Sequence, residues 1–220
     1  TALVTGGRVK IGFEVALRLL RSGCRVIVTT RFPTDARKRF ASQPAFGSFQ
    51  DKLVIIGADL SSRKQVLDMC ESVSSLCKTL DFVIHNAAQT VRRPREYYQS
   101  LLDVEEEGDR FCLAAPMRSL SSSLVASSSS ATALFHEGVF DEHGQQVDMS
   151  VINSWRLRLE AVSVEEVEEV HHINAIAPFI INMRLLPLMC AKWTGDKHIV
   201  HVSAVEGQVR NVNFFFFFYF

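Results

Sequence analysis

The sequence has no surplus of charge of either sign. Its 220 residues carry 24 Lys and Arg against 24 Asp and Glu, which argues against a bulk attraction to nucleic acid or to an anionic membrane surface. We therefore expect no nucleic-acid partner. No run reaches the roughly 20 apolar residues that cross a bilayer, so the sequence predicts no membrane span.

The sequence also lacks a metal or disulfide pattern. Its five cysteines are scattered without a CxxC pair, and the adjacent His171 and His172 have no Cys or carboxylate partner at metal-ligand spacing. We predict no metal site. An odd number of cysteines without a signal peptide favours a reducing compartment, so we expect a cytoplasmic protein.

The strongest pattern that is present lies in the first twelve residues, TALVTGGRVKIG. A short apolar run leads into a turn at Gly6 and Gly7, and apolar residues then recur at helical spacing over 11–22. A strand, a glycine turn and a helix start in succession leave backbone N–H groups at the positive end of a helix dipole. The sequence therefore predicts a phosphate-binding turn.

Apolar runs and helical patterns alternate along much of the chain. We predict strands at 2–5, 24–30, 53–58, 81–85 and 197–203, and helices at 11–22, 34–42, 63–78 and 164–190. Near-continuous apolar strands are typical of parallel strands that are covered on both faces. The predicted fold class is therefore α/β, with a doubly wound parallel sheet.

The alternation breaks between about 91 and 162. Eight of the twelve residues over 119–130 are Ser, and a connection of this length is uncommon inside a compact domain. We predict a long, partly disordered insertion in a single domain spanning 1–212, with Trp155 docked back on that domain. The aromatic tail at 213–220 is expected to lie outside the fold. Our hypothesis is that it reflects a mispredicted exon, a retained intron or a frameshift.

Polar motifs follow three further predicted strands, and another lies in the long helix. Asp59 follows the third strand, the fourth ends in His85-Asn-Ala-Ala88, Asn174 lies in the long helix, and Ser203 follows the fifth strand. With the glycine turn, this series resembles the short-chain dehydrogenase/reductase family, whose pattern is TGxxxGxG, an Asp, NNAG, an Asn and a Ser. The resemblance covers roughly 1–90 and 164–208, with the insertion outside it. It implies an NAD(P)-binding Rossmann fold that is incomplete after the fifth strand, with ligands outside the carboxyl ends of the strands.

The resemblance implies a set of contacts to a dinucleotide cofactor. They come from Gly6, Arg8, Lys10, Ile11, Gly12, Arg31, Asp59, Leu60, Asn86 and Ala87. Gly6 and Gly12 would let the backbone approach the pyrophosphate. Asp59 would hold the adenine edge, and Asn86 would steady the central strand beside the nicotinamide ribose. Lys10 replaces the middle glycine of the motif and adds positive charge beside the phosphates, while Asp59 has an alternative interpretation as a helix-start cap.

The residue after the second predicted strand bears on the choice of cofactor. NAD enzymes place a carboxylate there, which takes the ribose hydroxyls and repels a 2′-phosphate. This chain has Arg31, with Arg8 nearby in the turn, and a guanidinium suits a phosphate through its planar fork of donors. We therefore predict NADP(H) in preference to NAD(H).

The resemblance gives catalytic roles to Asn174, in a proton relay, and to Ser203, in orienting the substrate. Pro178 has no N–H, which leaves the Asn174 carbonyl able to hold a water. The alternative is a kinked helix with a capped polar residue. The family also uses a Tyr and, four residues on, a Lys. After Ser203 the sequence has no Lys, and its only Tyr is Tyr219.

Three functions stay open at this point. The first is an NADP(H)-dependent oxidoreductase acting on a small carbonyl or alcohol, represented by a C-terminally truncated or misread chain that is catalytically incomplete. The second is a non-catalytic dinucleotide-binding or interaction module, and the third is a non-functional gene-model product. Family members usually pair through the long helix and its neighbour, so the resemblance implies a homo-oligomer.

Overall fold

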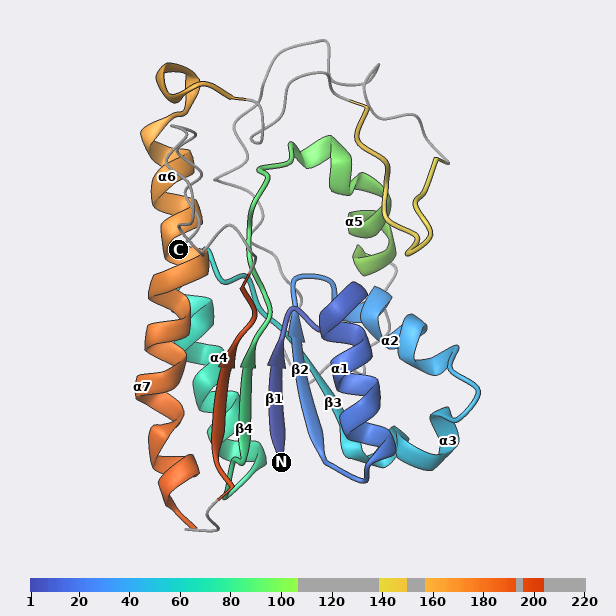
Figure 1. The fold of residues 1–220 in the computed structure, drawn as a ribbon. Coiled ribbons are helices and arrows are strands. Elements are labelled where there is room, and N and C mark those ends of the chain that lie inside the picture. Colours follow the sequence, from blue (N-terminus) through green and yellow to red (C-terminus); the bar gives the residue numbers. More distant parts are fainter. Residues whose placement is uncertain (107–138, 150–156, 193–195, 204–220) are drawn as a thin grey trace, which may run out of the picture.

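Five parallel strands form one sheet in the computed structural model, which describes residues 1–106, 139–149, 157–192 and 196–203. The strands are β1 (Ala2–Thr5), β2 (Val26–Thr30), β3 (Leu53–Gly57), β4 (Phe82–His85) and β5 (His198–His201). Their order is β3-β2-β1-β4-β5, and every neighbouring pair is parallel (Figure 1). The predicted doubly wound sheet is confirmed, and each strand lies within its predicted range.

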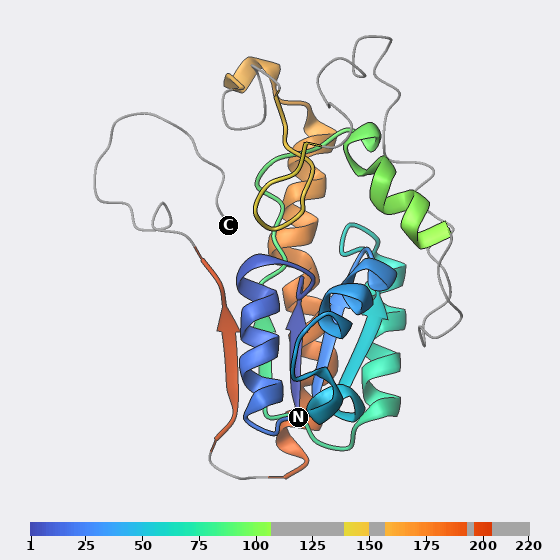
Figure 2. The same cartoon turned by 90° about the vertical axis from the view of Figure 1, so that its right-hand side faces the viewer.

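Helices cover both faces of the sheet. One face carries α1 (Lys10–Arg21), α2 (Pro33–Ala41) and α3 (Phe46–Phe49). The other carries α4 (Arg63–Leu76) and a long helix built from α6 (Val164–His171), a π-helical turn (His172–Ile176) and α7 (Ala177–Cys190). Figure 2 shows α1 in front of the sheet and the long helix behind it. Further helical elements of the described residues are α5 (Gln99–Glu106) and 3-10 turns at Gln50–Lys52, Arg95–Tyr98 and Leu159–Ala161.

Alternate strand residues contribute to two hydrophobic cores. Leu3, Ile27 and Val83 pack with α4 and α7 on one side of the sheet. Val4 and Val28 pack with α1, α2 and α3 on the other. Because both faces are covered, β1 and β2 are buried along their whole length, which explains the near-continuous apolar runs of the sequence.

Parts of the predicted insertion pack against the domain. Helix α5 packs against α2. Residues 139–149 form a turn to which Arg39 donates hydrogen bonds, at 2.6 Å to the His143 carbonyl and 3.2 Å to the Gly144 carbonyl. The serine-rich tract, Trp155 and the aromatic tail lie outside the described residues, so what the sequence predicts for them stays a prediction.

The long helix Val164–Cys190 is apolar and long enough to cross a membrane by length and composition, with a mean hydropathy of 1.5 in its most apolar window. The sequence predicted no such span. Ile173, Ala177 and Ile181 of this helix pack into the core against α4 and the sheet, as in the core helix of a globular domain. The helix is therefore only a weak candidate for a membrane span.

Candidate functional site

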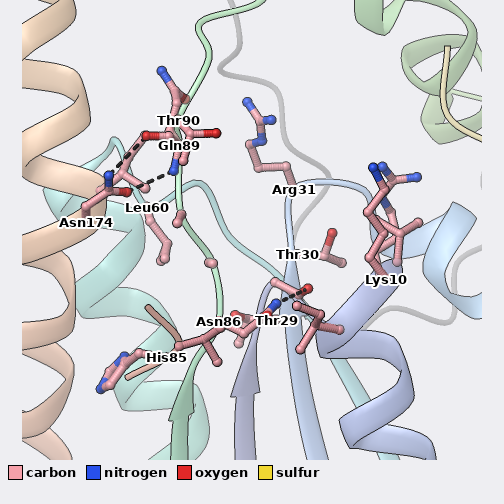
Figure 3. A pocket seen from close by; sticks show the side chains of 18 of the residues that line it. Lys10, Thr29, Thr30, Arg31, Leu60, His85, Asn86, Gln89, Thr90 and Asn174 are labelled. Atoms are coloured by element: carbon pink, nitrogen blue, oxygen red, sulfur yellow. Dashed lines mark hydrogen bonds between the residues drawn. The ribbon is translucent and has the colours of Figure 1, made fainter. Parts of the chain in front are cut away.

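A cavity of about 760 Å³ opens at the carboxyl ends of the strands, where open α/β sheets bind ligands (Figure 3). It is lined by every predicted site residue except Gly12, namely Gly6, Arg8, Lys10, Ile11, Arg31, Asp59, Leu60, Asn86, Ala87, Asn174 and Ser203. These residues meet because parallel strands present their carboxyl ends at one edge of the sheet. Its size is typical of a small-molecule site. That these residues contact a cofactor stays a prediction.

Two glycines of the family motif are required by the geometry of the turn. Gly6 has φ +65°, and a Cβ there would lie 2.8 Å from the Ala87 Cα atom. A Cβ on Gly12 would lie 2.4 Å from the Asn86 Nδ2 atom. That same Nδ2 donates a hydrogen bond of 3.0 Å to the Gly6 carbonyl. Gly12 thus lies beneath the turn, and Asn86 fixes the turn to the end of β4.

Thr5 makes a second link between β1 and β4. Its hydroxyl oxygen accepts hydrogen bonds from the backbone N–H groups of Asn86 and Ala87, both at 3.1 Å. The backbone N–H groups of Asn86 and Ala87 and the side chain of Asn86 therefore hold the chain after β4 against the end of β1 and the glycine turn. Such contacts fix the floor of the cavity.

Lys10 adopts the left-handed backbone conformation, with φ +53°. It occupies the position of the middle glycine in the TGxxxGxG motif, so the turn keeps a glycine-like backbone geometry although the residue is a lysine. Helix α1 begins here, its first turn has no acidic residue, and its N-cap Val9 makes no side-chain cap among the described residues. The N-terminus of α1 therefore faces the cavity in the arrangement that suits an anion.

Three basic side chains reach the cavity near α2, and each has a partner. Buried Arg8 forms an ion pair of 2.7 Å with Asp35, which also pairs with Arg39 at 2.6 Å. Burial lowers the pKa of the Arg8 guanidinium, while its hydrogen bond and ion pair with Asp35 act in the opposite direction. Lys10 lies 3.5 Å from an Asp141 carboxylate oxygen.

Arg31 differs from the other two because its partner is uncharged. Its Nη2 atom donates to the Tyr98 hydroxyl at 3.1 Å. Figure 3 shows Arg31 reaching into the cavity from the end of β2. Among these three basic side chains, Arg31 is therefore the one that is held by an uncharged partner, while the carboxylates of Asp59 and Glu169 attract its charge electrostatically.

Asp59 lies at the turn between β3 and α4. Its Oδ1 atom accepts from the Ser61 N–H at 2.9 Å and from the Ser61 hydroxyl at 2.8 Å. The N-cap of α4 is Ser62, which accepts from the Gln65 N–H, so Asp59 shapes the preceding turn and is not itself the cap. Next to it, the Leu60 carbonyl lies 2.8 Å from His172 Nδ1 of the long helix.

Asn174 joins the long helix to the chain after β4. Its Oδ1 accepts from the Gln89 N–H at 2.8 Å, and its Nδ2 donates to the Gln89 carbonyl at 3.0 Å (Figure 3). Asn174 lies within the π-helical turn that precedes Pro178, and such turns are frequent at functional sites. The side chain is thus used to position Gln89, while the water at its carbonyl stays a prediction.

Ser203 is exposed and follows β5 on the opposite side of the cavity from α2. The preceding Val202 donates its N–H to the His85 carbonyl at 2.9 Å, which continues the β4–β5 pairing to the cavity rim. Ser203 and Asn174 therefore line the same cavity from β5 and from the long helix. Within the described ranges, no group of three or more His, Cys, Asp or Glu side chains is placed to hold a metal.

Comparison with known proteins decides the family. The protein-family model described as short chain dehydrogenase matches residues 1–106 of the chain. The dehydrogenase/reductase SDR family member 11 of Gallus gallus is 27% identical over 124 residues, which cover 54% of this chain and 48% of that protein. The chain belongs to the short-chain dehydrogenase/reductase family.

A viral protein is similar to this chain over a longer stretch. An uncharacterized protein of Acanthamoeba polyphaga mimivirus is 31% identical over 212 residues, which cover 94% of this chain and 44% of that protein. The chain thus spans about half the length of these two curated relatives.

Solved structures of short-chain dehydrogenases share the fold. The RhlG/NADP active-site complex of Pseudomonas aeruginosa gives a TM-score of 0.58 at 19% identity, over 96% of this chain and 57% of that one. The NADPH-bound carbonyl reductase from chicken fatty liver gives 0.56 at 16% identity, over 97% of this chain and 63% of that one. At these identities the likeness concerns the fold alone.

Several residues that line the cavity were not predicted from the short-chain dehydrogenase pattern. Gln89, Tyr97 and Tyr98 come from the chain after β4, and His85 from the end of β4 itself. His85 is the last residue of a predicted strand and was visible as a departure from the family's Asn. Tyr98 gave no signal, because it lies in the insertion and its contact with Arg31 joins residues 67 positions apart.

Proposed function

We propose that this chain is the cofactor-binding unit of a short-chain dehydrogenase/reductase and that it binds NADP(H) in preference to NAD(H). The fit to a dinucleotide rests on the glycine turn, where any side chain at Gly6 or Gly12 would collide with the chain at Asn86 and Ala87. Glycines at the first and third motif positions allow the tight turn and the close helix–strand packing that a dinucleotide-binding turn requires. The N-terminus of α1 supplies the matching positive end of a helix dipole.

Arg31 is the observation that carries the preference for NADP(H). It stands directly after β2, where NAD enzymes have a carboxylate, and a neutral hydroxyl holds it. Its full charge and planar donors would therefore be directed to a 2′-phosphate. Arg8 is less effective, because its guanidinium already forms an ion pair with Asp35.

The residues on the far side of the cavity support carbonyl or alcohol chemistry. A bound nicotinamide supplies or accepts a hydride. Ser203 would orient the substrate oxygen by a hydrogen bond, and Asn174 would keep the chain at Gln89 in place beside it. The Tyr and Lys that move the proton in the family do not follow Ser203 in this sequence, so we propose that the 220 residues alone are catalytically incomplete.

The lack of this Tyr and Lys after Ser203 favours one alternative, a non-catalytic dinucleotide-binding module. The two functions differ in turnover and not in binding. A panel of small ketones and aldehydes with NADPH separates them when it is given to the protein expressed from the re-sequenced transcript and monitored by loss of nicotinamide absorbance, because neither function predicts turnover by the 220 residues alone. Binding of NADPH without any turnover supports the module, and turnover supports the enzyme.

The thiols agree with the reducing compartment that we propose. Cys24, Cys70, Cys77 and Cys190 are free in the described part of the chain. Burial raises the pKa of the Cys70 thiol to about 11, so it is protonated and unreactive at neutral pH. A cytoplasmic location follows as a proposal from these free thiols.

Replacing Arg31 by Asp tests the cofactor preference. We expect R31D to weaken NADPH binding by at least about tenfold, because an attraction for the 2′-phosphate becomes a repulsion. NADH binding should change by less than about threefold, since that cofactor has no 2′-phosphate. Both are measured by titration calorimetry.

The matched control is Arg37→Asp, which makes the same charge change at an exposed position of α2 outside the cavity lining. R37D should leave the ratio of the two affinities unchanged. Equal losses of NADPH and NADH affinity in R31D would contradict the proposed preference.

A further inference from the structure

The ordered segment Arg95–Glu106 of the insertion lies beside the end of the cavity that holds Arg31. In Figure 1 helix α5 lies beyond the carboxyl ends of the strands, above α2. The 3-10 turn Arg95–Tyr98 contributes Tyr97 and Tyr98 to the cavity lining. The insertion therefore forms part of the cavity wall, although it lies outside the motifs that identify the family.

Tyr98 makes three contacts with the chain after β2. Its hydroxyl accepts from Arg31 Nη2 at 3.1 Å, and the Arg31 guanidinium carbon lies 4.7 Å from the centre of its ring. The Tyr98 ring also packs on Phe32, with 5.6 Å between ring centres. One side chain thus holds the Arg31 guanidinium by its edge and by its face.

Glu105 ties the same segment to α2. Both of its carboxylate oxygens lie 3.0 Å from the Thr34 N–H, and Oε1 also accepts from the Asp35 N–H at 3.1 Å. The residue at the N-cap position of α2 is Phe32, which offers no side-chain oxygen. Glu105 therefore caps α2 from 71 positions away, and this cap fixes the place of Tyr98 relative to Arg31.

We propose that Tyr98 is a positioning residue for cofactor selection: it holds Arg31 ready for the 2′-phosphate of NADP(H). The proposal rests on the proposed function. A long Arg side chain loses rotamer freedom when it binds a phosphate, and a side chain that is already held loses less. The hydrogen bond to Tyr98 uses only Nη2, which would leave the other donors of the planar group for phosphate oxygens.

Two adenosine ligands isolate this effect in the full chain. Adenosine 2′,5′-bisphosphate and AMP differ only in the 2′-phosphate, and neither carries the nicotinamide. We expect Tyr98→Ala to weaken bisphosphate binding about tenfold and AMP binding less than twofold. Tyr98→Phe, which keeps the ring and removes the hydroxyl, should lie between the wild type and Tyr98→Ala.

A double-mutant cycle with Arg31→Ala tests whether Tyr98 acts through Arg31. In the Arg31→Ala background, replacing Tyr98 should cause no further loss of bisphosphate affinity. Gln99→Ala is the control, because Gln99 is an exposed residue of the same segment and bonds only to Asp103 among the described contacts. It should leave both affinities unchanged.

The outcomes separate the two proposals. Wild-type chain that binds neither ligand overturns the proposed function, and the role of Tyr98 with it. Wild-type chain that prefers the bisphosphate supports the proposed function. In that case, equal losses for both ligands on replacing Tyr98, or losses that add to those of Arg31→Ala, overturn the role of Tyr98 alone. Because Tyr98→Phe keeps the packing on Phe32, it remains informative if Tyr98→Ala fails to fold.

Discussion

Lys10 stands at a backbone position that glycine fills in the family motif. Its φ of +53° is costly for a residue with a Cβ, by roughly 1–2 kcal/mol. The cost is retained in a turn whose other two motif positions, Gly6 and Gly12, are fixed by close contacts with the chain after β4. Lys10 thus lowers the stability of the fold through backbone strain, and it places a positive charge at the N-terminus of α1, where a cofactor phosphate is proposed to bind.

Replacing Lys10 by Gly is expected to stabilise the protein. The left-handed strain is relieved, and the greater freedom of glycine in the unfolded chain offsets part of the gain. We expect the free energy of unfolding to rise by about 0.5–1 kcal/mol in urea denaturation. NADPH binding should weaken because a positive charge is lost.

Lys10→Ala is the matched control for this substitution. It removes the charge and keeps the strained backbone. NADPH affinity should then fall as in Lys10→Gly, with no rise in stability. A lower stability of Lys10→Gly than of Lys10→Ala would contradict the assignment of strain to this residue.

At the scale of elements, β4 and α7 are joined by a partly buried polar contact. His85 Nε2 lies 2.8 Å from Asn182 Oδ1, and the His85 ring stacks on His201 of β5 with 4.5 Å between centres. The His85 Nδ1 atom is buried without a hydrogen-bond partner among the described residues. The pKa of His85 is lowered to about 4 by burial and, to a smaller extent, by repulsion from His201, while the hydrogen bond with Asn182 acts in the opposite direction.

This histidine makes stability depend on pH. The unfolded chain takes up a proton near pH 6.5, whereas the folded chain does so only near pH 4, so the folded state loses stability as pH falls through this range. We expect a loss of about 2 kcal/mol from this group between pH 7.5 and pH 5. Urea denaturation at the two pH values measures it.

His85→Asn provides the comparison, because it places the residue usual in the family at this position and cannot titrate. Most of the loss between pH 7.5 and pH 5 should disappear in this variant. An unchanged pH dependence would show that His85 is not the responsible group. Readings at pH 5 avoid most of the titration of Asp81, whose pKa is lowered by hydrogen bonds from Lys197 and the N-terminal amine.

At the scale of the whole molecule, the long helix presents an apolar stripe to solvent. Ile176, Phe179, Met183 and Leu186 recur at helical spacing and are exposed, Phe179 by 66% of its surface. The buried residues of the same helix pack on α4 and the sheet, so the stripe is not covered within the described part of the chain. A contiguous apolar stripe of this kind is typical of an interface, and we propose that it pairs two copies of the chain.

Phe179→Glu tests this pairing. We expect the wild type to be a dimer or tetramer in light scattering after size exclusion, and Phe179→Glu to shift it to monomer, since a buried unpaired carboxylate is costly. Glu165→Gln, an exposed change on the first turn of the same helix, should leave the mass unchanged. A monomeric wild type would contradict the proposal.

The sequence determined the strands, the glycine turn and the family. Each strand is a short apolar run, and Gly6 and Gly12 mark positions where the backbone has no room for a side chain, so local patterns are sufficient to find them. The order of strand-end motifs also predicted which residues share the cavity, because parallel strands end at one edge.

Only the tertiary structure decided which partners hold those residues. That Tyr98 holds Arg31 and that Glu105 caps α2 depends on how the insertion returns to the sheet, and the ion pair of Arg8 with Asp35 depends on how α2 packs beside the glycine turn. Arg31 and Tyr98 are 67 positions apart, and His85 and Asn182 are 97 apart. Periodicity reports only the face of its own strand or helix, so it carries no information about such distant partners.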